Sequence, residues 1–195
     1  MKSLNRFYIF FTLLLFITLF SIITVFSRPE VCGYIDKVVD GDTVWISVED
    51  ILDSRFGNLS GESFKVRFAD VNAPELSTPE GLRSRDALLK LINEYGNFAC
   101  LDIDDRYIYD KYGRVVAILY LNYNETHLIN VNQYLVDNGY TEYVDYQNEF
   151  GESSFQLYIA KEGMVTDGDI PDIYLLLLLA LVVVIYIAKR KKIQL

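Results

Sequence analysis

Hydrophobic and polar residues alternate in the early part of the chain with the two-residue period that is typical of β-strands. This alternation predicts strands over residues 31–39, 43–48 and 64–71, with a turn at 40–42 between the first two. Side chains on a strand point alternately to its two faces, so Arg67 is expected to project away from its apolar neighbours. The first part of the fold is therefore expected to consist of short strands joined by turns.

A helical period follows the third strand. Thr78 is expected to cap a helix whose first residue is Pro79, and Gly96 is expected to end it. Two further helices are expected, one over residues 128–139 and one over residues 150–162. The chain therefore combines strands with about three helices.

Two more strands are expected between the helices, over residues 98–103 and 115–121, with Gly113 in the turn before the second of them. Short strands with turn signals between them predict a small closed barrel. The predicted fold is α+β but mainly β: an OB-fold barrel of five antiparallel strands with about three flanking helices, plus hydrophobic helices at both termini.

The 195-residue chain is strongly apolar at both ends. Residues 1–27 contain a long apolar run behind two basic residues, which predicts either a signal peptide or an uncleaved signal anchor. Residues 173–188 are uncharged, and four cations follow in residues 189–195, so a transmembrane helix with a basic cytoplasmic tail is expected. A buried core helix is the alternative for this second run.

The positive-inside rule places both basic flanks in the cytoplasm and the segment between the apolar runs outside it. This predicts a domain at residues 28–163, an acidic tether at 164–172, and one or two passes of the cell membrane, depending on cleavage of the first run. All 27 acidic residues but only 12 of the 18 basic ones lie in residues 28–172, giving a formal charge of −15. Such a domain repels nucleic acid at long range, so binding one would require local positive charge.

The small numbers of cysteine and histidine residues limit the kinds of metal site and catalytic mechanism that the chain could have. Cys32 and Cys100 are the only cysteines, and a pair outside the cytoplasm can oxidise to a disulfide; two buried free thiols are the alternative. His127 is the only histidine, which argues against a zinc site and against a histidine-dependent hydrolase.

Polar residues suited to phosphoryl chemistry occur in three separate stretches, at residues 40–42, 67–75 and 110–114. The first offers two carboxylates from one turn, with Gly41 expected to allow unusual backbone angles. Carboxylate, amide and carbonyl oxygens bind Ca²⁺, an arginine fork matches phosphate oxygens, and a free glutamate accepts a proton from water. Each stretch alone is typical of an ordinary turn or surface, but together they indicate phosphodiester hydrolysis.

These three stretches, in this order and at this spacing, resemble the staphylococcal nuclease (thermonuclease) family from about Val31 to about Glu162. The resemblance implies an OB-fold barrel that hydrolyses DNA, RNA or both with Ca²⁺ as its cofactor. It also implies roles for eight residues: Arg67 and Arg114 grip the scissile phosphate, Glu75 activates the attacking water, Asp42, Asn72 and the carbonyl of Ala73 bind the ion, Asp40 lies beside it, and Tyr112 lines the nucleotide pocket.

Asn72 departs from the pattern that the resemblance implies, because the family usually has a second carboxylate ligand there. An amide oxygen still binds Ca²⁺ but removes one negative charge, which predicts a weaker site suited to millimolar ion levels outside a cell. Asp70, two residues earlier on the same predicted strand, is expected on the same face and is a candidate to compensate. Loss of activity is the alternative interpretation.

The sequence therefore predicts a membrane-anchored, extracytoplasmic nuclease acting on DNA, RNA or both, and no protein partner is evident from it. A non-catalytic module on the cell surface that binds nucleic acid or another ligand is the main alternative. The chain keeps Asp42, Arg67, Glu75 and Arg114, which such modules lose. A purely structural surface protein is a weaker alternative, favoured only by the acidic charge.

Overall fold

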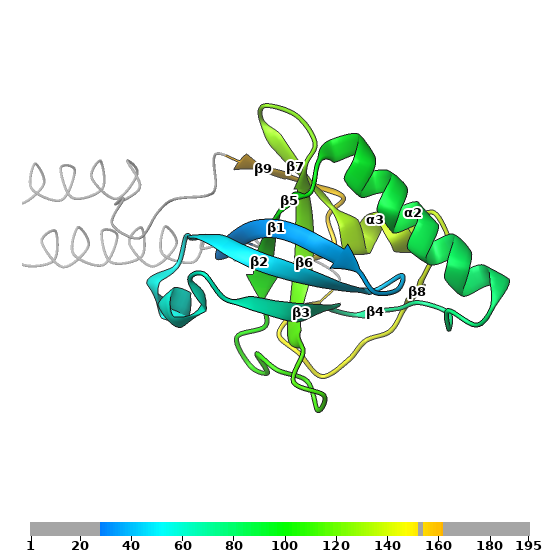
Figure 1. Cartoon of the computed structure of the whole chain (residues 1–195), viewed down its shortest axis with the longest axis horizontal. Helices are drawn as coiled ribbons and strands as arrows, with labels where there is room; N and C mark the ends of the chain where they lie inside the picture. Colours follow the sequence, from blue (N-terminus) through cyan, green and yellow to red (C-terminus); the bar gives the residue numbers. More distant parts are fainter. Residues whose placement is uncertain (1–27, 152–153, 162–195) are drawn as a thin grey trace, which may run out of the picture.

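The centre of the protein is a closed β-barrel, seen in a computed structural model that describes residues 28–151 and 154–161 (Figure 1). Five strands pair in the order β3-β2-β1-β5-β6, and β3 also pairs with β6, which closes the barrel. Their bounds are β1 (Val31–Val38), β2 (Thr43–Ile51), β3 (Ser63–Phe68), β5 (Phe98–Ile103) and β6 (Val115–Asn122). The expected five-stranded barrel is thus confirmed.

The closing pair of strands differs from the expected antiparallel arrangement. Four of the neighbouring pairs are antiparallel, whereas β3 and β6 run parallel, with Val66 opposite Val115 and Phe68 opposite Ala117. The reason is geometric: in a closed ring of five strands, directions cannot alternate all the way round. At least one neighbouring pair must therefore be parallel. Here that pair is β3 and β6, and a helix and β5 lie between these two strands in the sequence.

The interior of the barrel follows the predicted alternation of side chains. The buried hydrophobic residues of β2 and β3 are Val44, Ile46, Val48, Val66 and Phe68. Fully burying a side chain of this kind contributes about 1.5–3 kcal/mol relative to exposure. Arg67 lies between two of these buried residues, so its side chain leaves the barrel on the outer face, as expected.

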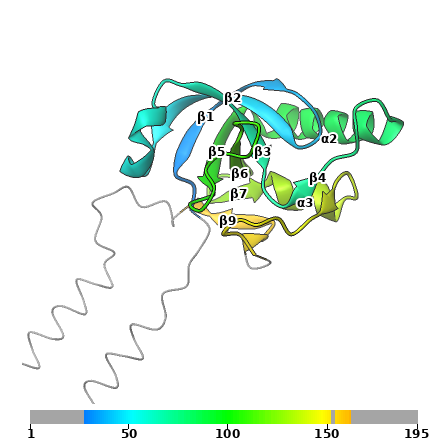
Figure 2. The ribbon, with the colours of Figure 1, turned by 90° about the horizontal axis from the view of Figure 1, so that it is seen from below.

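The helix α2 (Pro79–Tyr95) has the predicted caps and packs on the barrel with its apolar stripe. Thr78 Oγ1 accepts a hydrogen bond of 3.0 Å from the backbone N–H of Gly81, and Pro79 occupies the first turn. Gly96 ends the helix with a φ of +89°, a backbone angle that favours glycine. Figure 2 shows α2 and α3 (Val131–Asp137) on the same side of the barrel.

Of the two helices predicted near the C-terminal part of the described chain, the first is confirmed but begins later than expected, and the second is wrong. Leu128 belongs to the strand β7 (His127–Asn130), and α3 begins only after Asn130, whose side chain accepts a hydrogen bond from Gln133 N. The helix expected over residues 150–162 contains instead the strand β9 (Tyr158–Ala160), in which Ile159 pairs with Leu128. The segment pairs with the edge strand β7, whose backbone N–H and C=O groups would otherwise be unpaired. A short amphipathic pattern in the sequence does not reveal such pairing between distant residues.

The shorter elements complete the surface. A 3-10 helix, η1 (Ser54–Leu59), follows β2, and β4 (Val71–Asn72) pairs with β8 (Glu142–Tyr143) as a separate two-stranded sheet. The third predicted strand ends at Phe68 rather than at residue 71, because Asp70 has a φ of +53° and turns the chain. The segment after β3 therefore leaves the barrel and passes towards α2.

A disulfide joins two neighbouring strands of the barrel. Cys32 on β1 lies directly opposite Cys100 on β5, and the two sulfur atoms are 2.10 Å apart. The bond links positions 68 residues apart in sequence, so it constrains a large part of the unfolded chain.

The apolar runs at 1–27 and 173–188, the tether at 164–172 and the tail at 189–195 lie outside the described residues. Among the helices that are described, none has the length and apolar character needed to cross a bilayer.

Replacing both Cys32 and Cys100 with alanine is expected to lower the free energy of unfolding by about 2–4 kcal/mol, because the unfolded chain regains its freedom. Urea unfolding of the full-length protein, followed by circular dichroism, measures this difference. Reducing agent should destabilise the wild type to the level of the variant and leave the variant unchanged. Equal stability of the oxidised wild type and the variant would contradict the prediction.

Candidate functional site

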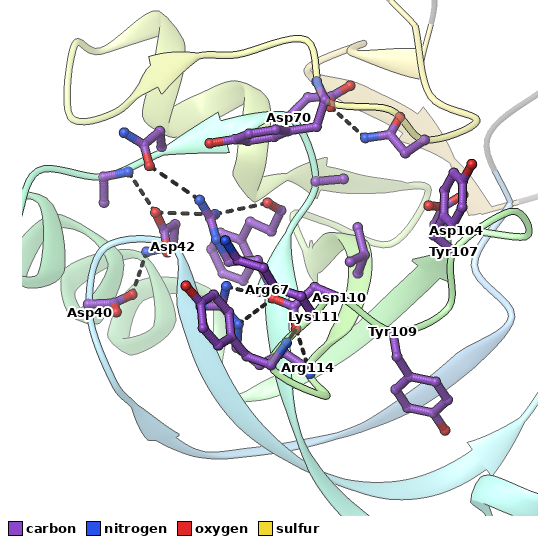
Figure 3. A pocket seen from close by; sticks show the side chains of 18 of the residues that line it. Asp40, Asp42, Arg67, Asp70, Asp104, Tyr107, Tyr109, Asp110, Lys111 and Arg114 are labelled. Carbon is purple, nitrogen blue, oxygen red and sulfur yellow. Dashed lines mark hydrogen bonds and ion pairs between the residues drawn. The ribbon is translucent and has the colours of Figure 1, made fainter.

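A cavity of about 950 Å³ lies beside the open end of β3, between segments that are far apart in sequence (Figure 3). Its walls come from the turn after β1, the chain from β3 to α2, the loop before β6, and the segment after β8. The cavity brings together all eight residues to which the sequence assigned a role in catalysis, ion binding or substrate binding: Asp40, Asp42, Arg67, Asn72, Ala73, Glu75, Tyr112 and Arg114.

The carboxylate of Asp42 links two of these walls. Its Oδ1 accepts a hydrogen bond of 3.0 Å from Thr43 Oγ1, and its Oδ2 accepts one of 2.6 Å from the backbone N–H of Ala73. Asp40 supports the turn from the other side, because its Oδ1 accepts the backbone N–H of Asp42 at 3.1 Å. The turn after β1 is thereby fixed against the chain that leaves β4.

Gly41 is required in this turn for a different reason from the one expected. Its φ is not among the positive values of the described residues, so unusual backbone angles do not explain it. A Cβ at this position would lie 2.0 Å from Ser84 Oγ on α2 and 2.8 Å from the Cβ of Ala73. Glycine thus allows the turn to press against α2, which brings Asp40 and Asp42 into the cavity.

Arg67 lies on the cavity wall next to Asp42. Its Nη1 is 3.2 Å from Asp42 Oδ2 and donates to the carbonyl of Phe68 at 3.1 Å, while its Nη2 donates to Asn72 Oδ1 at 3.4 Å. Burial raises the pKa of Asp42 above its usual range, and the charge of Arg67 and the N–H of Ala73 only partly oppose this effect. The site would therefore favour a further positive charge beside Asp42.

Arg114 is held on the neighbouring wall by Asp110. Its Nε and Nη2 lie 2.7 and 2.6 Å from Asp110 Oδ2, and Gly113 closes the loop with a φ of +74°, as expected. Although burial opposes it, hydrogen bonds from Arg114 and Tyr112 lower the pKa of Asp110. Arg114 Nη1 reaches Thr43 Oγ1 at 3.4 Å, so both arginines are connected through Thr43 and Asp42 and face the same cavity.

Glu75 and Asn72 reach the same cavity from the chain between β4 and α2, and both are exposed. The carboxylate of Glu75 forms no hydrogen bond or ion pair within the described residues, which leaves it available as a proton acceptor. Its backbone carbonyl is fixed, because it accepts hydrogen bonds from the N–H and the hydroxyl of Thr78 at 2.9 and 2.7 Å. The N-cap of α2 thus also positions Glu75.

The donor atoms around Asp42 fit a hard cation, because the side chains that could hold one offer oxygen ligands only: Asp40, Asp42 and Asn72. Within residues 28–151 and 154–161, no three His, Cys, Asp or Glu side chains gather as a metal cluster. An ion at this site would therefore depend on Asp42, amide and carbonyl oxygens, water and substrate.

Asp70 does not lie where the sequence placed it. The chain turns at this residue, and Asp70 Oδ1 accepts hydrogen bonds from Asn148 Nδ2 at 2.5 Å and from the backbone of Tyr146 at 3.0 Å. Burial raises its pKa, and it faces away from Asp40 and Asp42 in Figure 3. Asp70 therefore supports the far wall of the cavity rather than compensating for Asn72.

Sequence reasoning missed this far wall entirely. Asp104 accepts hydrogen bonds from the backbone of Arg106 and Glu149, and it lines the cavity together with residues 146–148. Asp70 and Asp104 are fully buried, and each keeps one carboxylate oxygen without a hydrogen-bond partner in the described part of the chain. No local motif marks these residues, because apart from Arg106 their hydrogen-bond partners are 45 to 78 positions away.

The fold and the site together define a five-stranded barrel of the OB type with an arginine- and carboxylate-lined cavity beside it. A sequence model of the family described as "Staphylococcal nuclease homologue" matches residues 65–163, about half of the chain. The chain belongs to this family.

Two relatives give the scale of the similarity. Micrococcal nuclease of Shigella flexneri is 29% identical over 122 residues, which are 60% of this chain and 61% of that protein. Uncharacterized protein MJ1439 of Methanocaldococcus jannaschii is 30% identical over 131 residues, which are 55% of this chain and 56% of that protein. The chain thus spans less than two thirds of the length of the curated relatives it matches.

Gly81→Ala is expected to lower the free energy of unfolding by about 1–3 kcal/mol, because overpacking against backbone forces a shift. The added Cβ would lie 2.1 Å from the carbonyl oxygen of Glu75. Gly57→Ala is the matched control, since nothing lies within 4 Å of its added Cβ. Urea unfolding compares the two, and an unchanged or raised stability of Gly81→Ala would show that α2 does not press on the Glu75 backbone.

Proposed function

We propose that this protein hydrolyses phosphodiester bonds of DNA, RNA or both in a reaction that depends on Ca²⁺. The observation that carries the proposal is the convergence of Arg67, Arg114, Asp42 and Glu75 on one cavity from three separate segments. Membership of the staphylococcal nuclease homologue family and the similarity to a protein named micrococcal nuclease support it.

The two arginines bind the scissile phosphate and stabilise the charge that develops in the transition state. Each guanidinium has five N–H donors in a planar fork. Asp42 and Asp110 hold the two forks in place before substrate arrives. Because these charges are already oriented, little reorganisation is needed during the reaction, which is the basis of electrostatic catalysis.

Glu75 acts as the general base. Its exposed carboxylate lines the cavity and has no competing partner in the described chain, so it can accept a proton from the attacking water. Asp42, Asn72 and the carbonyl of Ala73 would hold Ca²⁺ with Asp40 beside them, and Tyr112 would line the nucleotide pocket. The ion would neutralise a phosphate oxygen and help to orient the water.

We also propose that the enzyme is attached to the cell membrane with its nuclease domain outside the cytoplasm. Residues 28–163 form the nuclease domain outside the cytoplasm, and the apolar runs at 1–27 and 173–188 attach it to the cell membrane, the first only if it is retained. The lengths and charged flanks of the runs support this topology. The Cys32–Cys100 disulfide supports an oxidising compartment.

Arg67→Ala, Arg114→Ala and Glu75→Gln are each expected to reduce the rate of cleavage by about 100-fold or more, since each removes phosphate binding or proton transfer. Plasmid and single-stranded DNA, incubated with Ca²⁺ or with chelator, provide the assay. Arg85→Ala is the control, because Arg85 pairs with Asp86 outside the cavity. Binding without cleavage by the wild type would favour the alternative, a non-catalytic binding module.

Asn72→Asp is expected to lower the Ca²⁺ concentration for half-maximal cleavage by roughly tenfold, because it restores a charged ligand. Asn58→Asp adds the same charge at an exposed position outside the cavity and should leave this concentration unchanged. Calorimetry should likewise show weak binding of Ca²⁺ to the wild type. Submicromolar affinity in the wild type would refute the idea that Asn72 weakens the site.

A further inference from the structure

The hairpin between β6 and β7 carries a tripeptide that has no part in the cavity. Asn124, Glu125 and Thr126 form the pattern Asn-x-Thr with a middle residue other than proline, which is the acceptor sequence for an N-linked glycan. The same kind of pattern occurs once more, at residues 58–60, as Asn-Leu-Ser. Three residues of sequence are a weak indication by themselves, so the structure around each tripeptide has to distinguish them.

The two tripeptides differ in how far the fold exposes them. Residues 124–126 are all exposed, and they lie in the connection between two strands. In the other tripeptide the middle residue, Leu59, is only 6% exposed and packs in the hydrophobic core, and it ends the 3-10 helix η1. A transferase can therefore reach residues 124–126 on the folded domain, whereas it would have to disrupt η1 to grip residues 58–60.

The side chain of Asn124 is held by its oxygen and leaves its nitrogen available. Its Oδ1 accepts hydrogen bonds from the backbone N–H and the hydroxyl of Thr126 at 2.9 and 3.1 Å, and from the backbone N–H of His127 at 2.8 Å. Within the described part of the chain, Nδ2 forms no hydrogen bond. An amide nitrogen is a poor nucleophile, but donors at Oδ1 stabilise the negative charge that forms on the oxygen when Nδ2 loses a proton. The turn therefore favours reaction at Nδ2.

The hairpin lies at the far end of β6 from the cavity. This strand of eight residues begins directly after Arg114, and at about 3.3 Å per residue it is roughly 25 Å long. None of residues 122–127 lines the cavity, and Figure 1 shows the hairpin and the loop before β6 at opposite ends of the strand. The backbone N–H of Lys161 donates to the carbonyl of Thr126 at 2.9 Å. A group attached to Asn124 would thus lie beside Lys161 and clear of a bound substrate.

We propose that Asn124 is an N-glycosylation site, at which Nδ2 bonds to the anomeric carbon of an oligosaccharide carried by a lipid phosphate. The bond between that carbon and the phosphate oxygen breaks, and its electron pair leaves with the lipid phosphate. The proton of Nδ2 passes to a base of the transferase, and nothing is oxidised or reduced. The inference rests on one part of the proposed function, the location of residues 28–163 outside the cytoplasm, because acceptor tripeptides are modified on secreted chains.

Synthesis of the full-length chain in the presence of sealed endoplasmic reticulum vesicles, which contain an oligosaccharyltransferase and its lipid-linked donor, tests the site. The wild type is expected to gain a single glycan, seen as slower migration in gel electrophoresis that treatment with N-glycosidase reverses. This treatment converts the modified amide to a carboxylate, so mass spectrometry of the peptides identifies the residue. Asn124→Gln is expected to abolish the glycan completely.

Two further variants change the tripeptide without changing the asparagine. Thr126→Ala should also abolish the glycan, because it removes the hydroxyl that the acceptor pattern requires, and Thr126→Ser should retain the glycan, because it keeps that hydroxyl. Asn58→Gln is the matched control and should migrate as the wild type does. A glycan that Asn124→Gln retains in full, or one that only Asn58→Gln removes, would overturn the site.

Protease added outside the sealed vesicles separates this inference from the proposed function. If residues 28–163 are protected but carry no glycan, the site is wrong and the proposed location stands. If they are digested and carry no glycan, both fail. The DNA cleavage assay is independent of either result, because the hairpin lies outside the cavity and Asn124→Gln should cleave as the wild type does. A wild type that is glycosylated at Asn124 but cleaves nothing would support the site and refute the proposed hydrolysis.

Discussion

The buried carboxylate of Asp42 is the interaction on which the whole site depends. It accepts hydrogen bonds from Thr43 and from the backbone of Ala73, and it pairs with Arg67. A buried charge is costly unless hydrogen bonds and opposite charge compensate it. The same contacts that satisfy this carboxylate therefore also fix the turn after β1, the chain after β4 and the arginine on β3 in one arrangement.

This arrangement places two arginines at one cavity of a strongly acidic domain, as the proposed binding of a phosphate requires. The arginines are few, but Asp42 and Asp110 fix their orientation, and Thr43 connects them. Repulsion at long range falls off over about 8–10 Å at physiological salt, whereas contacts inside a cavity are screened much less. Local geometry rather than net charge therefore dominates the electrostatics inside the cavity.

Local sequence patterns predicted most of the barrel correctly and failed where backbone pairing competes with them. The alternation in β2 and β3 and the caps of α2 at Thr78 and Gly96 depend only on neighbouring residues, and the structure confirms them. The helix expected over 150–162 was wrong because Ile159 pairs with Leu128 across a sheet edge. Likewise, Gly41 is needed for contact with Ser84 on α2, which no local pattern reveals.

The sequence by itself determined the five strands of the barrel, the caps of α2 and the residues with chemistry suited to phosphate, because periodicity and residue type are local properties. Only the tertiary structure decided that β3 and β6 close the barrel in parallel, and that Asp70 turns away from Asn72 towards Asn148. It also decided that the tyrosines of the loop before β6 line the same cavity as Tyr146. These features depend on contacts between distant residues, which form only when the barrel closes and brings the ends of its strands together.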